Sequence, residues 1–239
     1  MNPKSNHILA ALSESMFQRL LPKLGLVSLT KNQVLYEEGG GQQGVYFPIN
    51  ATLALQNHGA DDFINDVALV GHHSMTMAGK CCSLVSFDRT IVRLPGLAYR
   101  MGIEEFVATV REDAPTLMQL HELTQHRMKQ MAKNIACASH HSAEQRIARL
   151  LLELMDLTSL HDIDLTHQEV ADSIGVRRES VSIHLKELER EQAIEIHRGK
   201  ICELDHHRIH HHSCGCYQGL ETNTPKTPHC WPCIDPQLI

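Results

Sequence analysis

The chain has 239 residues, of which 42% are apolar and 21% charged, and this composition is ordinary for a globular protein with a sizeable buried core. No apolar run is long enough to cross a bilayer, and the first residues lack the apolar segment of a secretory signal, so we expect a cytoplasmic protein without membrane partners. The net charge of −6 gives no support for nucleic-acid binding by itself. In such a chain the eight cysteines are expected to be reduced, redox-active or metal-binding.

The N-terminal part of the sequence changes from a helical to a strand pattern. Residues 1 to about 20 predict one short amphipathic helix, because apolar residues recur there at helical spacing: Ile8, Leu9, Leu12, Met16, Phe17 and Leu20. From about residue 26 to 103, short runs of alternating apolar and polar residues are separated by Gly, Asn and Pro. This pattern predicts a small antiparallel barrel or roll.

A long helical pattern begins at Glu104. Its apolar side repeats with a period of about 3.5 residues, which is that of two packed helices. We name these residues the dimer seam: Leu117, Leu120, Thr124, Met128, Met131 and Ile135. The helix either packs on its own roll or pairs with its copy in a homodimer, and we favour the homodimer. Cys137 falls on the same side, either as a small buried residue or as the site of an oxidative crosslink between copies.

The run THQEVADSIGVRRESVSIHLKEL, residues 166–188, follows a break near residues 139–142 and a further amphipathic helix. Thr166 and Glu169 have the spacing of a capping box, in which each side chain accepts a hydrogen bond from the other residue's backbone N–H group. Gly175 can end this first helix in the left-handed conformation. A second helix then has a buried stripe of Val181, Leu185 and Leu188. The pattern is that of a helix-turn-helix.

The polar side of this run predicts contacts with DNA. Arginines and small hydroxyl residues at the start of a second helix suit base recognition in the major groove, although two core helices with solvated charges would share the letter pattern. Two short strands, AIEIH and KICEL, form a predicted wing whose basic residues can reach phosphate. The predicted DNA-binding residues are Thr166, His167, Gln168, Arg177, Arg178, Glu179, Ser180, Ser182, Ile183, Lys186, Arg198 and Lys200.

These motifs resemble the Crp/Fnr family of transcription regulators. Residues 165–205 resemble its winged helix, ACASHHSAEQRIARLLLEL resembles its hinge, and DFINDVALVG resembles the turn at its effector pocket. The resemblance covers about residues 10 to 217. It implies an α+β fold with a cyclic-nucleotide-binding-like antiparallel β-roll, a long dimerisation helix and a C-terminal winged helix-turn-helix. The implied divisions are a sensor domain at 1–105, the dimerisation helix at 106–140, the DNA-binding domain at 141–217 and a flexible tail at 218–239.

The resemblance also implies the mode of action. The chain would be a homodimer on a palindromic site in double-stranded DNA, with RNA polymerase as a further partner. The family's base-reading positions fall on Arg178, Glu179 and Ile183. Cyclic-AMP-type members have an arginine at the third position, whereas an isoleucine there can contact a thymine methyl and predicts another half-site preference. Gln192 replaces a usual glycine before the wing and predicts a strained turn.

The implied sensor departs further from the cyclic-AMP pattern. Asn65 and Asp66 stand where cyclic-nucleotide-binding members have Gly-Glu, and the phosphate-binding arginine falls near Ser86, with Arg89 the nearest candidate. Asn65, Asp66 and Arg89 are therefore the candidate effector-pocket residues, and cyclic AMP is disfavoured because its phosphate would be an uncompensated buried charge. No cysteine precedes Cys81, which argues against an iron–sulfur sensor.

Other thiol and imidazole groups leave the signal and any cofactor unidentified. Cys81-Cys82, with His72-His73 nearby, are either loop residues or ligands of haem, zinc or copper, or a redox-sensing pair. Cys214-x-Cys216-Tyr217 resembles a common ending of the family and is not interpreted as a metal site alone. In the tail, Cys230-x-x-Cys233 and His229 are candidate metal ligands. The sequence has no H-E-x-x-H, Walker or G-x-S-x-G motif, so we do not expect an enzyme.

Overall fold

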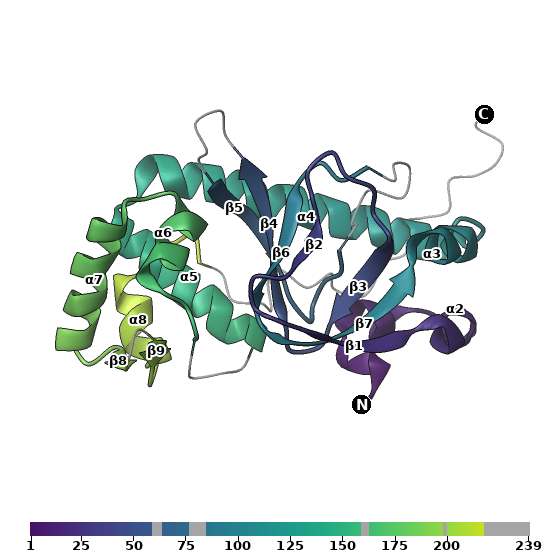
Figure 1. Cartoon of the computed structure of the whole chain (residues 1–239), viewed down its shortest axis with the longest axis horizontal. Helices are drawn as coiled ribbons and strands as arrows, with labels where there is room; N and C mark the ends of the chain where they lie inside the picture. The colour runs from purple at the N-terminus through teal and green to yellow at the C-terminus, as the bar shows by residue number, and fades with distance from the viewer. Residues whose placement is uncertain (59–63, 77–84, 159–162, 198–199, 218–239) are drawn as a thin grey trace.

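The structure is a computed structural model that describes residues 1–58, 64–76, 85–158, 163–197 and 200–217. It is an α+β fold, as predicted, with antiparallel sheets in the N-terminal half and a winged helix-turn-helix in the C-terminal half. The long helix α4 (Ala114–His140) runs behind both halves, and α7 (Arg178–Arg190) lies at the outer edge of the molecule (Figure 1).

Two antiparallel sheets form the roll. One has the order β1-β7-β3 and contains Gly25–Leu29, Gly96–Gly102 and Gly44–Pro48. The other has the order β2-β6-β4-β5 and contains Val34–Tyr36, Arg89–Leu94, Thr52–His58 and Ile64–Val70. Strand β4 shows how its residues serve both faces of a sheet, since side chains alternate along a strand. Leu53 and Leu55 are buried between the sheets, whereas Ala54 packs against the C-terminal half.

The N-terminal segment is not the single helix that its spacing predicted. It forms a 3-10 turn at Pro3–Ser5, helix α1 (His7–Ala11), helix α2 (Glu14–Leu20) and a second 3-10 turn at Leu21–Lys23. The break arises because the Ser13 hydroxyl accepts a hydrogen bond from the Met16 N–H group at 3.2 Å and starts a new helix. The apolar residues of both helices still bury against the roll and against α3 (Ile103–Val110).

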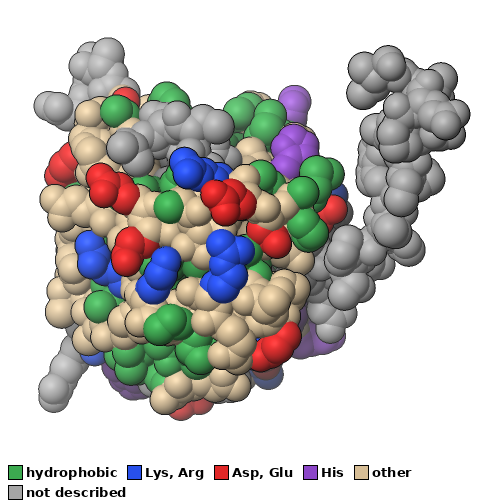
Figure 2. Space-filling model, turned by 90° about the vertical axis from the view of Figure 1, so that its right-hand side faces the viewer, with side chains coloured by type: hydrophobic (Ala, Val, Ile, Leu, Met, Phe, Trp, Pro, Cys, Tyr) green, Lys and Arg blue, Asp and Glu red, His purple; other side chains and the backbone are tan. Residues whose placement is uncertain are grey.

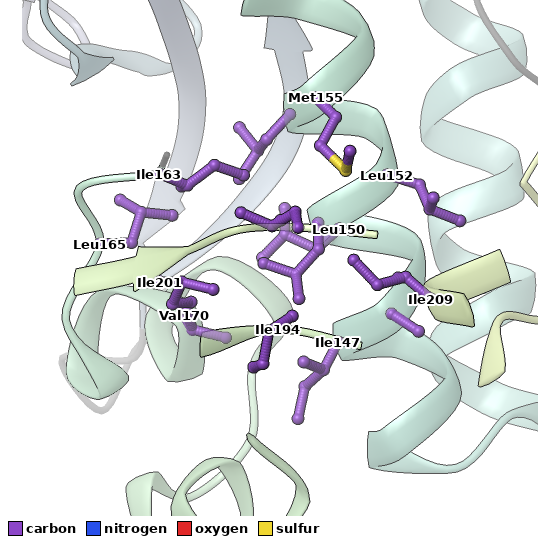
Figure 3. Close-up of a cluster of buried hydrophobic side chains, with 14 of the residues drawn as sticks. Ile147, Leu150, Leu152, Met155, Ile163, Leu165, Val170, Ile194, Ile201 and Ile209 are labelled. Atoms are coloured by element: carbon purple, nitrogen blue, oxygen red, sulfur yellow. The ribbon is translucent and has the colours of Figure 1, made fainter. Parts of the chain in front are cut away.

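Helix α5 (Ala143–Thr158) forms the core of the C-terminal half. Around it lie α6 (His167–Ile174), α7, the wing strands β8 (Glu195–His197) and β9 (Lys200–Cys202), and α8 (His206–His212). Ile147 and Leu150 of α5 meet Val170 of α6, Ile194 and Ile201 of the wing region (Figure 3). The helix-turn-helix and the wing are thus built on one shared apolar core.

The same core continues onto the outer face of the β-roll. Leu69, Ile91 and Leu94 of the β2-β6-β4-β5 sheet belong to the cluster that contains α5. At the end of β5, Gly71 lies so close to α5 that a Cβ atom there would be 2.7 Å from Leu157 Cδ2. The C-terminal half is therefore packed directly against the roll.

Because Leu185 is fully buried in α7, truncating it should destabilise the helix-turn-helix. We expect Leu185→Ala to lower the free energy of unfolding by about 2–5 kcal/mol, as other buried leucines do when they leave a cavity. Urea denaturation followed by circular dichroism measures this change. Ile183→Ala is the matched control, since Ile183 is 64% exposed and its loss should cost less than about 0.5 kcal/mol. Equal losses in the two variants would contradict the burial of Leu185.

Candidate DNA-binding surface and sensor cavity

The helix-turn-helix begins at the predicted capping box. The Thr166 hydroxyl accepts a hydrogen bond from the Glu169 N–H group at 3.2 Å, and the Glu169 carboxylate accepts one from the Thr166 N–H group at 2.7 Å. Gly175 ends α6 in the left-handed conformation with a φ of +63°. Both predictions are confirmed, and together they fix the angle at which α7 leaves α6.

Helix α7 separates a buried stripe from an exposed polar face. Val181, Leu185 and Leu188 are buried as predicted. On the other side the structure exposes four charged side chains and the large apolar side chain of Ile183: Arg177, Arg178, Glu179, Lys186 and Ile183. Ser180 and Ser182 are half-buried. The first turns of α7 thus present two guanidinium groups, one carboxylate and one aliphatic group to an incoming partner.

The start of α6 completes this surface. Thr166, His167, Gln168 and Arg178 line one shallow hollow, so four of the predicted DNA-binding residues lie together. The Ser182 hydroxyl donates a hydrogen bond to the Arg178 carbonyl at 3.1 Å and lies 2.9 Å from His167 Nδ1. Burial, with the positive charges of Arg178 and Lys186, lowers the pKa of His167. A phosphate placed in the hollow would counter this cationic environment.

The wing lies next to this surface. Lys200 is exposed, with its Nζ 3.7 Å from an Asp164 carboxylate oxygen, while Arg198 lies outside the described residues. Gln192, where the sequence predicted a strained turn, has a φ of +57°. This left-handed conformation costs a non-glycine residue roughly 1–2 kcal/mol. Arg208 stabilises it by donating hydrogen bonds to the Gln192 carbonyl and side-chain oxygens at 3.2 and 3.1 Å.

At the end of the molecule opposite α7, positive and negative side chains are mixed. Figure 2 shows the end that carries α2 and α3, where Lys and Arg side chains are interspersed with Asp and Glu on the described part of the face. Such a mixed surface does not favour a polyanion. The α6 and α7 end is therefore the better candidate for DNA contact.

The candidate effector residues do not form one group, since Asn65 and Asp66 lie on β5 and Arg89 begins β6, with β4 between the two strands. Asp66 is 3% exposed and pairs with Arg93, whose Nη2 lies 2.6 Å from Asp66 Oδ1 and 2.7 Å from Oδ2. Arg89 instead pairs with Glu37 at 3.1 Å. The cation that neutralises Asp66 is thus Arg93, which the sequence analysis did not single out.

Asp66 also connects the roll to the helix-turn-helix. Its carboxylate accepts a hydrogen bond from Ser173 Oγ of α6 at 2.6 Å and one from Gln56 Nε2 of β4 at 3.0 Å. Beside it, Asn65 approaches Gly175 so closely that a Cβ atom on Gly175 would lie 2.3 Å from Asn65 Oδ1. The two residues at the expected effector position therefore contact the DNA-binding half directly.

A cavity of about 440 Å³ lies between β5 and helices α4, α5 and α6, and we name it the sensor cavity. Asn65, Asp66 and Ser173 line one side, and Met131 and Arg149 line the other. Arg149 also donates a hydrogen bond to Asn134 Oδ1 at 2.6 Å. The cavity is large enough for a small organic ligand.

Among the other predicted sensor groups, His72 and His73 lie in the described part of the chain, and neither lines this cavity. Cys81 and Cys82 are outside the described residues, as are His229, Cys230 and Cys233. His72 Nδ1 lies 3.0 Å from the Leu157 carbonyl oxygen. Burial lowers the pKa of His73 to about 3, so this imidazole is neutral at physiological pH. In the described part of the chain, neither histidine belongs to a group of three or more metal-ligand side chains.

The dimer seam is divided between a buried and an exposed side of α4. Leu120 is 5% exposed, and Met131 packs against the core of the roll. By contrast Leu117, Met128 and Ile135 are 37%, 58% and 69% exposed. Their spacings of eleven and seven residues place them on one face of the helix. One chain therefore leaves an apolar row of α4 uncovered.

Four side chains that the sequence analysis left separate are brought together at the end of α4. Cys137, His141, Cys214 and Cys216 have ligand atoms that all lie within 4.8 Å of one another, and we name them the sulfur cluster. Cys137 is 1% exposed and faces Cys214 of the same chain, so of its two interpretations the structure agrees with the small buried residue and not with a crosslink between copies. Burial raises the pKa of Cys137 to about 12.

Comparison with known proteins gives a domain match for residues 145–211 and a shared fold for most of the chain. Residues 145–211 match the model of the Crp-like helix-turn-helix domain. No curated protein sequence matches the chain. None of the described helices is both long and apolar enough to cross a membrane.

Solved structures of transcription regulators share the fold over most of their length. A Crp/Fnr-family regulator from Eubacterium rectale is 18% identical with a TM-score of 0.68, covering 87% of this chain and 98% of its own. FixK2 from Bradyrhizobium japonicum is 16% identical with a TM-score of 0.67, covering 80% and 98%. The c-di-GMP-responsive regulator CLP from Xanthomonas campestris is 14% identical with a TM-score of 0.64, covering 81% and 100%.

Since Ser173 bonds to Asp66 across the two halves, removing its hydroxyl should loosen their contact. We expect Ser173→Ala to increase amide hydrogen exchange in α6 and β5, because a hydrogen bond to a charged group contributes about 1.5–3 kcal/mol. Exchange followed by mass spectrometry measures this effect. Ser139→Ala is the control, since that exposed hydroxyl bonds only to its own helix at Ile135. Unchanged exchange in α6 would show that the Asp66–Ser173 contact does not hold the two halves together.

Proposed function

We propose that this chain, which has the Crp/Fnr fold and a Crp-like helix-turn-helix domain, is a sequence-specific transcription regulator that binds palindromic DNA as a homodimer. The observation that carries the proposal is the exposed polar face of α7, held on a capped helix-turn-helix beside a wing. Its partners would be double-stranded DNA, a second copy and RNA polymerase in the cytoplasm. The chain would act by binding and not as an enzyme.

Base recognition would come from the first two turns of α7. Arg178 would bond a guanine edge, Glu179 would accept a hydrogen bond from cytosine N4, and Ile183 would contact a thymine methyl. The remaining predicted residues would position the duplex through its phosphates: Thr166, His167, Gln168, Arg177, Ser180, Ser182, Lys186, Arg198 and Lys200. Ile183 then selects a half-site and does not weaken binding in general.

The homodimer would form along the exposed part of the dimer seam. Leu117, Met128 and Ile135 are apolar, exposed and aligned, which is the pattern expected where a second helix packs. Two copies related by a twofold axis would present their α7 helices to successive major grooves. This arrangement accounts for a palindromic site.

The signal would act through the sensor cavity. Cyclic AMP is disfavoured, because Arg93 is already paired with Asp66 and Arg89 with Glu37. A cyclic-nucleotide-binding regulator therefore remains the weaker alternative. A regulator of the same fold that responds to haem, metal or thiol oxidation is the other alternative, and the sulfur cluster favours its metal form.

Arg178 provides the sharpest test of DNA recognition. We expect Arg178→Ala to weaken binding to a specific operator by about 1–3 kcal/mol, or about 5- to 150-fold, because a bidentate guanine contact is lost. Operators selected from a random DNA pool supply the probe, and fluorescence anisotropy at fixed salt supplies the affinity. Arg190→Ala is the matched control, since Arg190 is exposed in the last turn of α7. Equal effects of the two substitutions would contradict the base-reading role of Arg178.

Ile135 tests the homodimer. We expect the wild-type chain to have twice its monomer mass by light scattering, and Ile135→Glu to yield monomers, because two buried carboxylates would face each other across the seam. Lys129→Glu alters an exposed charge of α4 outside the apolar row and should leave the dimer intact. A monomeric wild type, or a dimeric Ile135→Glu variant, would exclude this interface.

A further inference from the structure

The sulfur cluster joins two parts of the chain that are distant in sequence. Cys137 lies in the last turn of α4, and His141 follows the end of that helix. Cys214 and Cys216 follow α8, the last described helix. Cys137 and Cys214 are buried, while His141 and Cys216 are half-buried, so the cluster lies at the surface of the core with one side accessible.

The distances within the sulfur cluster suit a tetrahedral zinc ion. Zinc bonds of about 2.3 Å to sulfur and about 2.05 Å to nitrogen place two sulfur ligands about 3.8 Å apart, and sulfur and nitrogen about 3.6 Å apart. Cys137 Sγ and Cys214 Sγ are 3.5 Å apart, and Cys216 Sγ and His141 Nδ1 are 3.6 Å apart. No two of the four ligand atoms are more than 4.8 Å apart, so small side-chain rotations would bring all of them to one ion.

From this geometry we propose that Cys137, His141, Cys214 and Cys216 bind one structural zinc ion that fastens the end of α4 to the segment after α8. Three sulfurs and one imidazole nitrogen form the Cys3His set of closed structural zinc sites. A disulfide between Cys137 and Cys214 would leave the third sulfur and the imidazole without a role. The second group of potential ligands, Glu144, His184 and Glu187, has no sulfur.

The surroundings can balance the charge of such a site. Zinc with three thiolates carries a net charge of −1. The Arg149 guanidinium is buried and attracts negative charge on Cys137. Lys133 likewise attracts negative charge on Cys216. Arg149 is oriented by Asn134 of α4 and lies near Glu153 of α5, with Nη1 3.7 Å from that carboxylate. Cationic groups therefore flank the thiolates, as a negatively charged metal site requires.

The zinc ion would restrict the connection between the sensor and the DNA-binding half. Only residues 141–142 separate α4 from α5, and His141 is one of the proposed ligands. Coordination would close a loop from the end of α4 through the whole winged helix-turn-helix. Because the ion binds the folded arrangement, its binding free energy adds to the stability of that arrangement.

Metal analysis of the full chain tests the site directly. Protein purified with a reductant and dialysed against a weak chelator is measured by mass spectrometry for zinc, and we expect one zinc ion per chain. Replacement by cobalt(II) should give the sulfur-to-metal absorption bands of a tetrahedral site. In the zinc form, Cys137, Cys214 and Cys216 should resist alkylation, while Cys202, which lies outside the cluster, should react. Zinc-free protein, or a Cys137–Cys214 disulfide in the reduced preparation, would overturn the proposal.

Variants identify the ligands without relying on DNA binding. Cys216→Ser and His141→Ala should each lose zinc and lower the melting temperature, and both positions are half-buried, so the fold should tolerate the change. Cys202→Ser is the matched control and should retain zinc. A double Cys230→Ser, Cys233→Ser variant should also retain it. Loss of zinc from this tail variant, or its retention in Cys216→Ser, would place the metal elsewhere and refute the site.

Discussion

Helix α5 is buried by two parts of the chain at once, the outer face of the β-roll and the winged helix-turn-helix. Five of its apolar residues are fully buried: Ile147, Ala148, Leu151, Leu152 and Leu154. A helix that is apolar on several sides cannot be stable alone in water and depends on both coverings. The positions of α6, α7 and the wing relative to the roll therefore follow from how α5 is packed.

The Asp66–Arg93 pair sets the polar part of the same junction. A carboxylate that is 3% exposed is tolerated only with a matching cation and filled hydrogen-bonding capacity, and Arg93, Gln56 and Ser173 provide these. Asp66, where the sequence predicted an effector contact, instead forms a contact between the two halves of the chain.

The sequence predicted those features that depend on neighbouring residues. The capping box of Thr166 and the turn at Gly175 involve side chains and backbone within a few residues, so their patterns are visible in the letters. The partner of Asp66 was not predictable from neighbouring residues in the sequence. The strand register aligns Asp66 with Gln56 and Gln56 with Arg89, but the carboxylate pairs with Arg93, which lies where the pairing of β6 with β4 shifts between Thr52 and Leu53.

The sulfur cluster was missed by the sequence analysis because its members are also distant in sequence. Cys137 and Cys214 are 77 residues apart, and each has an ordinary local explanation, one as a small helical residue and one as part of a common ending. The packing of α8 against α5 brings the segment after α8 to the end of α4, and this places the two cysteines together. Residues that act as a group across domains leave no local pattern when their spacing follows from tertiary structure.

If zinc binds the sulfur cluster, the two polar attachments of the C-terminal half differ in strength, and this difference suggests where a signal can act. At the end of α4, four ligand atoms can be joined by one metal ion, whereas the contact at β5 includes the hydrogen bond from Ser173 to Asp66 at 2.6 Å. The sensor cavity is lined by residues of both attachments, including Asp66 and Cys137. A ligand that fills it competes more easily with hydrogen bonds than with metal–thiolate bonds. We therefore expect motion to occur at the β5 contact, with the end of α4 as its fixed point.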